Sequence, residues 1–153
     1  MQLISAALVS VDSSLPEIVL RVERQKLTKR LWRGIANDGA EFGFELSSPL
    51  KHGDVFFQDA TGRYAIEQMA EPLVEIALDM TASAAAGIGW AIGNLHLELS
   101  AESTRLLAPD EPAVRQLLER LKVSFNPTTA IFRPGRFVRG NLPANELGPS
   151  HKH

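Results

Sequence analysis

One stretch decides how the second half of this chain folds: Gly89-Trp90-Ala91-Ile92-Gly93-Asn94-Leu95-His96-Leu97-Glu98-Leu99. It follows a run of small residues that Thr81 is suited to cap, which predicts a helix over 81–92. Gly93 and Asn94 are the residue types that most readily take the left-handed conformation ending a helix. The alternation that follows predicts a strand over 95–99, with the leucines on one face and His96 on the other.

The elements around this stretch alternate in a recognisable order. Apolar patterns predict strands over 73–78 and 104–107, and a helix follows Asp110, with apolar residues at positions 114, 117, 118 and 121. A last strand is expected from 123–125 or 131–132. The order strand, helix, strand, strand, helix, strand is the split βαβ plan of a ferredoxin-like domain, which we assign to residues 73–134.

Residues 1–72 instead show several short β-type runs separated by turn residues. The clearest signal is a hairpin, in which the segments 31–36 and 41–46 flank Asn37-Asp38-Gly39-Ala40. Runs at 3–11, 18–22, 55–57 and 64–66 add further strands. We therefore predict an α+β protein with a β-rich N-terminal domain, a small barrel or sandwich, over 1–72. Residues 135–153, rich in glycine, proline and asparagine, are expected to form a mobile tail.

Composition limits the chemistry that is open to the chain. The 153 residues carry a formal net charge of −2, so no overall field favours nucleic acid or membrane. There is no cysteine, which leaves oxygen and imidazole nitrogen as ligands or reactive groups. The N-terminus lacks a basic signal region, and no apolar run approaches the roughly 20 residues of a membrane span. The expected location is cytoplasmic.

Four histidines are the candidate metal ligands. By itself, His96 is most simply a partly exposed strand residue without a ligand. It could bind a metal only with a second source of ligands, which a two-fold dimer would provide. His151 and His153 are either solvated or additional imidazoles, and the three together suit nickel, copper or zinc. His52 fits an ordinary turn beside Asp54.

A basic segment spans residues 21–33, with six lysines and arginines and one acid. A solvated strand edge, or a surface that docks an acidic protein, explains it better than nucleic-acid binding, because aromatic residues are few. Gly87 and Gly89 are interpreted as helix-packing residues, since no helix begins beside them to hold a phosphate. No catalytic residues can be named, and the chain is not expected to be an enzyme.

Taken together, the motifs resemble the urease accessory protein E family, the nickel metallochaperones of urease maturation. The most specific of them is Gly93-Asn94-Leu95-His96, which looks like the Gly-Asn-x-His motif of the family. The resemblance also rests on these segments: Arg24 to Arg33, Asp38-Gly39-Ala40-Glu41-Phe42-Gly43-Phe44, Leu50-Lys51-His52-Gly53-Asp54, Tyr64-Ala65-Ile66 and Glu71-Pro72-Leu73.

This resemblance implies a homodimer with a partner-docking N-terminal domain and a metal-binding C-terminal domain. His96 of each subunit would meet its mate and hold Ni(II), with His151 and His153 as further ligands and with Zn or Cu as competitors. The implied partners are the urease apoprotein and its other accessory proteins, including the GTPase.

The chain departs from the family pattern at three places. It has Leu95 where many members have a basic residue, His-Lys-His where many have a long histidine-rich tail, and no histidine in 105–110. One interfacial site, with or without the tail, is therefore expected instead of storage of several ions. The alternative is a protein-interaction module of the same fold that has lost metal binding.

Overall fold

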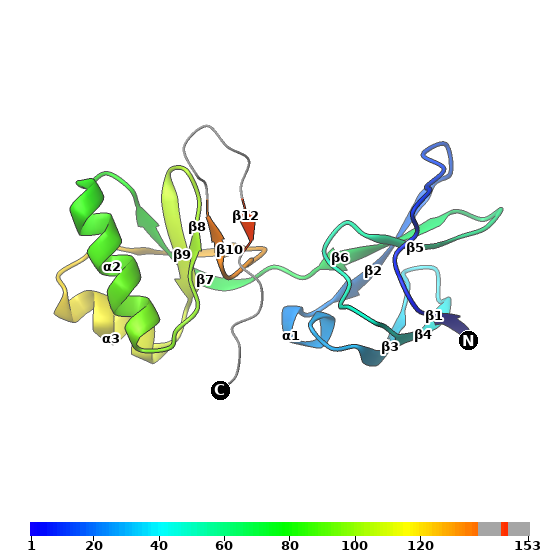
Figure 1. Ribbon diagram of the computed structural model, residues 1–153, viewed down its shortest axis with the longest axis horizontal. Helices are drawn as coiled ribbons and strands as arrows, with labels where there is room; N and C mark the ends of the chain where they lie inside the picture. The colour runs from blue at the N-terminus through cyan, green and yellow to red at the C-terminus, as the bar shows by residue number, and fades with distance from the viewer. Residues whose placement is uncertain (138–144, 147–153) are drawn as a thin grey trace. The chain divides into compact units, whose positions relative to one another are not determined.

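The computed structural model describes residues 1–137 and the backbone of 145–146, and it divides into two compact units. Unit 1 is Met1–Met69 and unit 2 is Ala70–His153. Strands predominate in both, with few helices, so the predicted α+β class is confirmed (Figure 1). None of the helices in the described ranges is long and apolar enough to cross a membrane.

Unit 1 contains two three-stranded sheets, ordered β1-β4-β3 and β2-β6-β5. The predicted hairpin is present: β3 and β4 pair antiparallel, and Gly39 takes the left-handed conformation (φ 89°) in their turn. The elements are β1 (Gln2–Ile4), β2 (Glu17–Val22), α1 (Arg24–Leu27), β3 (Leu31–Ile35), β4 (Glu41–Glu45), β5 (Val55–Gln58) and β6 (Arg63–Gln68).

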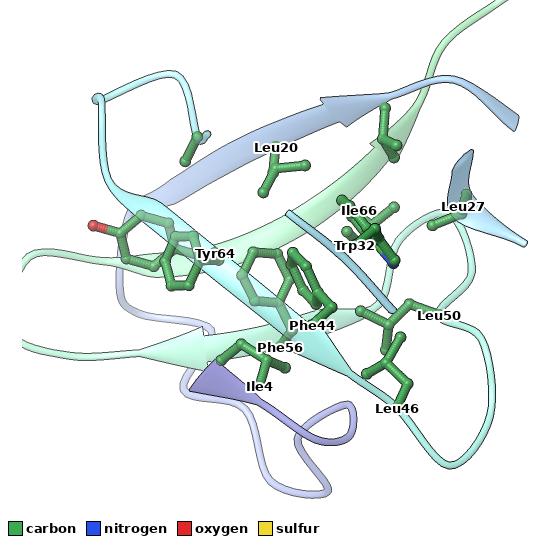
Figure 2. Packing of buried hydrophobic residues seen from close by; sticks show 13 residues of the cluster. Ile4, Leu20, Leu27, Trp32, Phe44, Leu46, Leu50, Phe56, Tyr64 and Ile66 are labelled. Atoms are coloured by element: carbon green, nitrogen blue, oxygen red, sulfur yellow. The ribbon is translucent and has the colours of Figure 1, made fainter. Parts of the chain in front are cut away.

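Aromatic rings fill the core of unit 1 (Figure 2). Trp32 and Phe44 stack with their ring centroids 4.0 Å apart, and Phe56 meets Phe44 edge to face. Tyr64 lies at one end of this cluster, with its hydroxyl pointing away from the other labelled rings. That hydroxyl donates a 2.6 Å hydrogen bond to Oδ2 of Asp38, which raises the pKa of Tyr64 to about 12. The core is thereby tied to the hairpin turn.

Two sequence predictions for unit 1 need correction. The run at 3–11 forms a strand only over β1, beside β4. The basic segment is a strand edge only in part: β2 and β3 each lie at the edge of a sheet, and the short helix α1 lies between them. Leu27 explains the helix, since it is buried in the core while Lys26 on the same turn remains exposed.

Unit 2 has an antiparallel sheet in the order β10-β7-β9-β8, the arrangement of a ferredoxin-like domain. Both longer helices cover one face of this sheet, where they pack on Val74 and Ile76 (Figure 1). The elements are β7 (Glu71–Ala77), α2 (Ala82–Asn94), β8 (Ser100–Ala101), β9 (Arg105–Pro109), α3 (Pro112–Arg120), β10 (Asn126–Ala130), β11 (Arg136–Phe137) and β12 (Asn145–Glu146).

Two strands of unit 2 lie elsewhere than predicted. The run 95–99 is not a strand, since pairing begins only at Ser100. The last strand is β10, between the two segments that the sequence suggested. Val123 and Phe125 join the core under the helices, whereas Phe132 crosses to the opposite face and buries Leu73 and Leu107. Both apolar segments are thus explained by packing on the sheet instead of pairing in it.

The segment predicted as a mobile tail falls mostly outside the described residues. Within it, β11 and β12 pair antiparallel, with Arg136 opposite Glu146. A two-stranded ladder therefore begins directly after Gly135.

Candidate metal site at the end of helix α2

Helix α2 begins as the sequence predicts, because Oγ1 of Thr81 accepts a 3.2 Å hydrogen bond from the Ala84 N–H. The helix carries no charged residue, and only Ile88 and Ile92 are buried. It therefore touches the sheet along one narrow stripe, and the rest of its apolar surface faces outward.

The end of α2 differs from the prediction, and the difference concerns His96 directly. Gly93 and Asn94 are helical, and His96 is the residue in the left-handed conformation (φ 57°). Its N–H donates to the Gly93 carbonyl at 2.9 Å, and the Leu97 N–H donates to the Ile92 carbonyl at 3.2 Å. This pair of bonds is a Schellman motif. Such a motif commonly has an apolar contact between a residue just after the helix, here Leu97, and one in its last turn, here Ile92. Leu97 packs on the cluster that contains Ile92, and this contact sets where the helix ends.

Helix α3 ends in the same way without a histidine. Lys122 has φ 57°, its N–H donates to the Glu119 carbonyl at 3.0 Å, and the Val123 N–H donates to the Leu118 carbonyl at 2.9 Å. The backbone motif therefore does not require an imidazole at this position. The geometry of the turn therefore leaves the residue type at position 96 open.

The imidazole of His96 is exposed, so it is not part of the core. It lies at the C-terminal end of α2, where the unsatisfied carbonyls and the helix dipole favour a cation. In residues 1–137, no group of three or more histidine, aspartate or glutamate side chains is placed to hold a metal ion. A set of three or more protein ligands that includes His96 therefore needs at least one ligand from outside this range or from another copy.

His151 and His153 lie outside the described residues. The backbone that leads toward them begins beside the loop that carries His96, because the Gly135 N–H donates to the Leu99 carbonyl at 2.8 Å. Glu146 is paired with Arg136, the residue next to Gly135.

The outward face of α2 carries a residue that sequence reasoning did not single out. Trp90 is 70% exposed, between Gly87 and Gly93, which have open space where a side chain would lie. Among the described residues the interpretation of Gly87 and Gly89 as close-packing residues is wrong, since nothing lies close to Gly87 and Leu99 approaches Gly89 to an ordinary 3.5 Å. A large aromatic residue in an uncharged, small-residue helix was the signal that could have identified this face.

His52 has the structural role that its turn suggests. Its Nδ1 accepts a 3.0 Å hydrogen bond from the Gln68 N–H, and Oδ2 of Asp54 accepts one from the Lys51 N–H at 2.8 Å. These bonds fix the loop that precedes β5. Because the Nδ1 lone pair is already used, His52 is not a candidate ligand through that atom.

Comparison with known proteins finds one family across the chain. Residues 71–153, more than half of the chain, match the family model described as UreE urease accessory protein, C-terminal domain. Urease accessory protein UreE of Lysinibacillus sphaericus is 26% identical over 80% of this chain and 83% of its own length. UreE of Bifidobacterium longum subsp. infantis is 31% identical over 65% of this chain and 43% of its own length. UreE of Staphylococcus aureus is 27% identical over 68% of this chain and 70% of its own length.

Proposed function

We propose, from the premise that this chain belongs to the UreE family of urease accessory proteins, that it binds Ni(II) and delivers it during assembly of the urease active site. The protein would act as a cytoplasmic homodimer, with His96 of both subunits sharing the ion and with His151 and His153 as additional ligands. Its partners would be the urease apoprotein and the other accessory proteins, including the GTPase. No catalytic reaction is assigned to it.

The observation that carries this proposal is the position of His96. It is exposed and it follows the last turn of a helix. Lys122, at the equivalent position after α3, shows that the turn does not need a histidine. A single imidazole cannot hold a divalent ion firmly, so a second copy is the economical source of another. The uncharged outer face of α2, centred on Trp90, is a suitable surface for that copy.

The proposed ligand set fits a carrier. Imidazoles suit nickel, copper and zinc, and an ion with few protein ligands keeps exchangeable positions through which a partner can take it. Affinity order alone does not favour nickel over copper, so both copper and zinc should compete. Because the ligands must be unprotonated, binding should weaken as the pH falls through roughly 6 to 7.

Calorimetric titration with Ni(II) tests the metal site. Wild-type protein should bind one ion per dimer, His96→Ala should lose it, and His52→Ala, a matched histidine deletion, should keep it. Removal of 151–153 should weaken binding without abolishing it. Unchanged affinity in His96→Ala would refute the site, and loss of all binding on tail removal would assign the essential ligands to the tail.

The same preparations distinguish the alternative function. Light-scattering mass should show a dimer, which Trp90→Glu should disrupt because it places a carboxylate on the outer face of α2 that the second copy would cover. Gln116→Glu, at an exposed position of α3, should leave the mass unchanged. Wild-type protein that forms the dimer but binds no nickel at micromolar concentration would instead support an interaction module without metal.

A further inference from the structure

The turn between β3 and β4 contains a pair of residues that can rearrange its own backbone. Asp38-Gly39 is the only Asp-Gly pair in the sequence, and no Asn-Gly pair occurs. Glycine at the second position lets its backbone nitrogen approach the side-chain carboxyl carbon of the aspartate, because there is no Cβ in the way. Both residues are exposed, and among the described residues no atom lies near the place that a Gly39 side chain would take. Neighbouring side chains therefore do not shield this pair.

The rearrangement converts aspartate to isoaspartate in two steps. The Gly39 nitrogen attacks Cγ of Asp38, a C–N bond forms, and the amide proton leaves with the carboxyl hydroxyl as water, so that a succinimide ring remains. Water from the solvent then opens the ring. Cleavage of the new C–N bond restores aspartate, whereas cleavage of the original peptide bond leaves the chain running through Cγ. The first step needs a protonated carboxyl group, because a carboxylate has no hydroxyl to lose.

Hydrogen bonds hold each of the reacting groups in the folded turn. The Gly39 N–H donates to the Ala36 carbonyl at 2.9 Å. Oδ1 of Asp38 accepts a 3.0 Å hydrogen bond from the Ala40 N–H, which makes an Asx turn, and Oδ2 accepts one of 2.6 Å from the Tyr64 hydroxyl. The nitrogen and the carboxylate that would react are thus each bound to another group.

Of these bonds, the one from Tyr64 comes from outside the hairpin, on β6. The Tyr64 side chain is buried, and its ring lies 5.0 Å from that of Phe42 and 5.7 Å from that of Phe57, which fixes the hydroxyl in place. This hydroxyl first, and then the Ala40 N–H, hold the pKa of Asp38 below its ordinary value. The carboxyl group is therefore kept in the ionised form, which does not react.

The Tyr64 hydroxyl remains a donor across the pH range in which Asp38 titrates. Its bond to Asp38, followed by burial, raises the pKa of Tyr64 to about 12, and the charge of Asp59 acts in the same direction. Protonation of Asp38 is thus the one change in this pair that acid brings about.

We propose that Asp38-Gly39 is a site of isoaspartate formation, and that Tyr64 is a positioning residue that suppresses the reaction in the folded protein. Isoaspartate adds a methylene to the backbone of the turn and shortens the side chain, so the bond to Tyr64 would be lost. The modified hairpin would no longer be tied to the core of unit 1. The site needs neither nickel nor a second copy.

Peptide mapping of the full chain after incubation at about pH 5 tests the proposal. Trypsin releases residues 34–51, in which Asp38 is the only aspartate. Isoaspartate changes the retention of this peptide but not its mass, whereas deamidation of Asn37 raises the mass. Folded wild-type protein should form the isomer about tenfold more slowly than a synthetic peptide of residues 34–51. Equal rates in protein and peptide would overturn the proposal.

Tyr64→Phe keeps the ring in the core and removes only the hydroxyl. In protein with unchanged circular dichroism, it should speed isomer formation about tenfold. Ile66→Val, a buried position on the same strand, is the matched control for general loss of stability and should leave the rate unchanged. Equal rates in wild type and Tyr64→Phe, or equal acceleration by the two variants, would overturn the role of Tyr64.

The pH profile separates this role from a purely structural one. Because the protonated carboxyl group reacts, the rate should fall as the pH rises through the folded pKa of Asp38. Loss of the Tyr64 bond raises that pKa toward its ordinary value, so the fall should come at higher pH in Tyr64→Phe than in wild type. Identical profiles would contradict the proposal. Adding Asp38→Glu, whose longer side chain does not form the succinimide ring, should remove the isomer from residues 34–51, and an isomer that survived would refute the site.

Discussion

Helices α2 and α3 end in the same backbone geometry but present very different surfaces. Each has a residue at φ 57° after its last turn. In each, the N–H of the following residue donates to the carbonyl of a fully buried residue, Ile92 in α2 and Leu118 in α3. The outer face of α2 is uncharged, whereas that of α3 exposes Glu119 and Arg120. The shared geometry is a requirement of folding. The two helices differ in their outer faces and in the residue at the left-handed position, and these differences point to function.

The largest effect is expected where the two helix ends are alike. Ile92→Ala and Leu118→Ala each remove a completely buried side chain and leave a cavity, and each should lower the free energy of unfolding by about 2–5 kcal/mol. Urea denaturation followed by circular dichroism measures both. A much smaller loss for Ile92→Ala would mean that α2 is held less firmly than its buried stripe indicates.

A smaller effect of opposite sign should separate structure from function. His96→Gly and Lys122→Gly each put the preferred residue at a left-handed position, so each should stabilise the chain by about 0.5–1 kcal/mol. Only His96→Gly should lose nickel binding in calorimetry. If both variants still bound nickel, His96 would have no role as a metal ligand. If His96→Gly lowered stability, the imidazole would have a structural contact that the exposed position does not show.

Effects of similarly small size are expected at the beginnings of the two helices, which differ in how their contributions to stability depend on pH. Thr81→Ala removes the cap of α2 and should cost about 1 kcal/mol at every pH. At α3, the hydrogen bonds of the Arg115 guanidinium, 2.6 and 2.9 Å long, hold the pKa of Asp110 below its ordinary value.

A carboxylate with a depressed pKa stabilises the fold above its unfolded pKa, and this contribution is lost as the pH falls through the folded value. Asp110→Asn should therefore lower stability at neutral pH and have little effect near pH 2. Thermal melts across this range measure the difference. An Asp110→Asn penalty that persisted in acid would show that packing, and not charge, is the contribution of this side chain.

The sequence predicted the elements of the fold well where local chemistry and packing agree. Gly39 favours the turn between β3 and β4, and the flanking segments alternate, so the hairpin was predictable. Thr81 similarly marks the start of α2. The order of strands and helices in unit 2 was sufficient to predict its sheet.

The prediction failed where packing overrides residue preference. Gly93 and Asn94 prefer the left-handed conformation, but the contact of Leu97 with the cluster around Ile92 moves the helix end to His96. The alternation of 95–99 reflects side chains that pack beside a helix, not a paired strand. For the candidate site, the sequence proposed His96, which stays a prediction. It missed Trp90, because the exposure of that side chain depends on how α2 lies on the sheet.

The tryptophans give each unit an optical label of its own. The chain contains only two, with Trp32 stacked in the core of unit 1 and Trp90 in water on unit 2. Emission from the enclosed indole should shift to longer wavelength when unit 1 unfolds, while that of the exposed indole hardly changes. A Trp90→Phe protein would therefore report the unfolding of unit 1 alone, and Trp32→Phe would leave a fluorophore that senses only what covers helix α2.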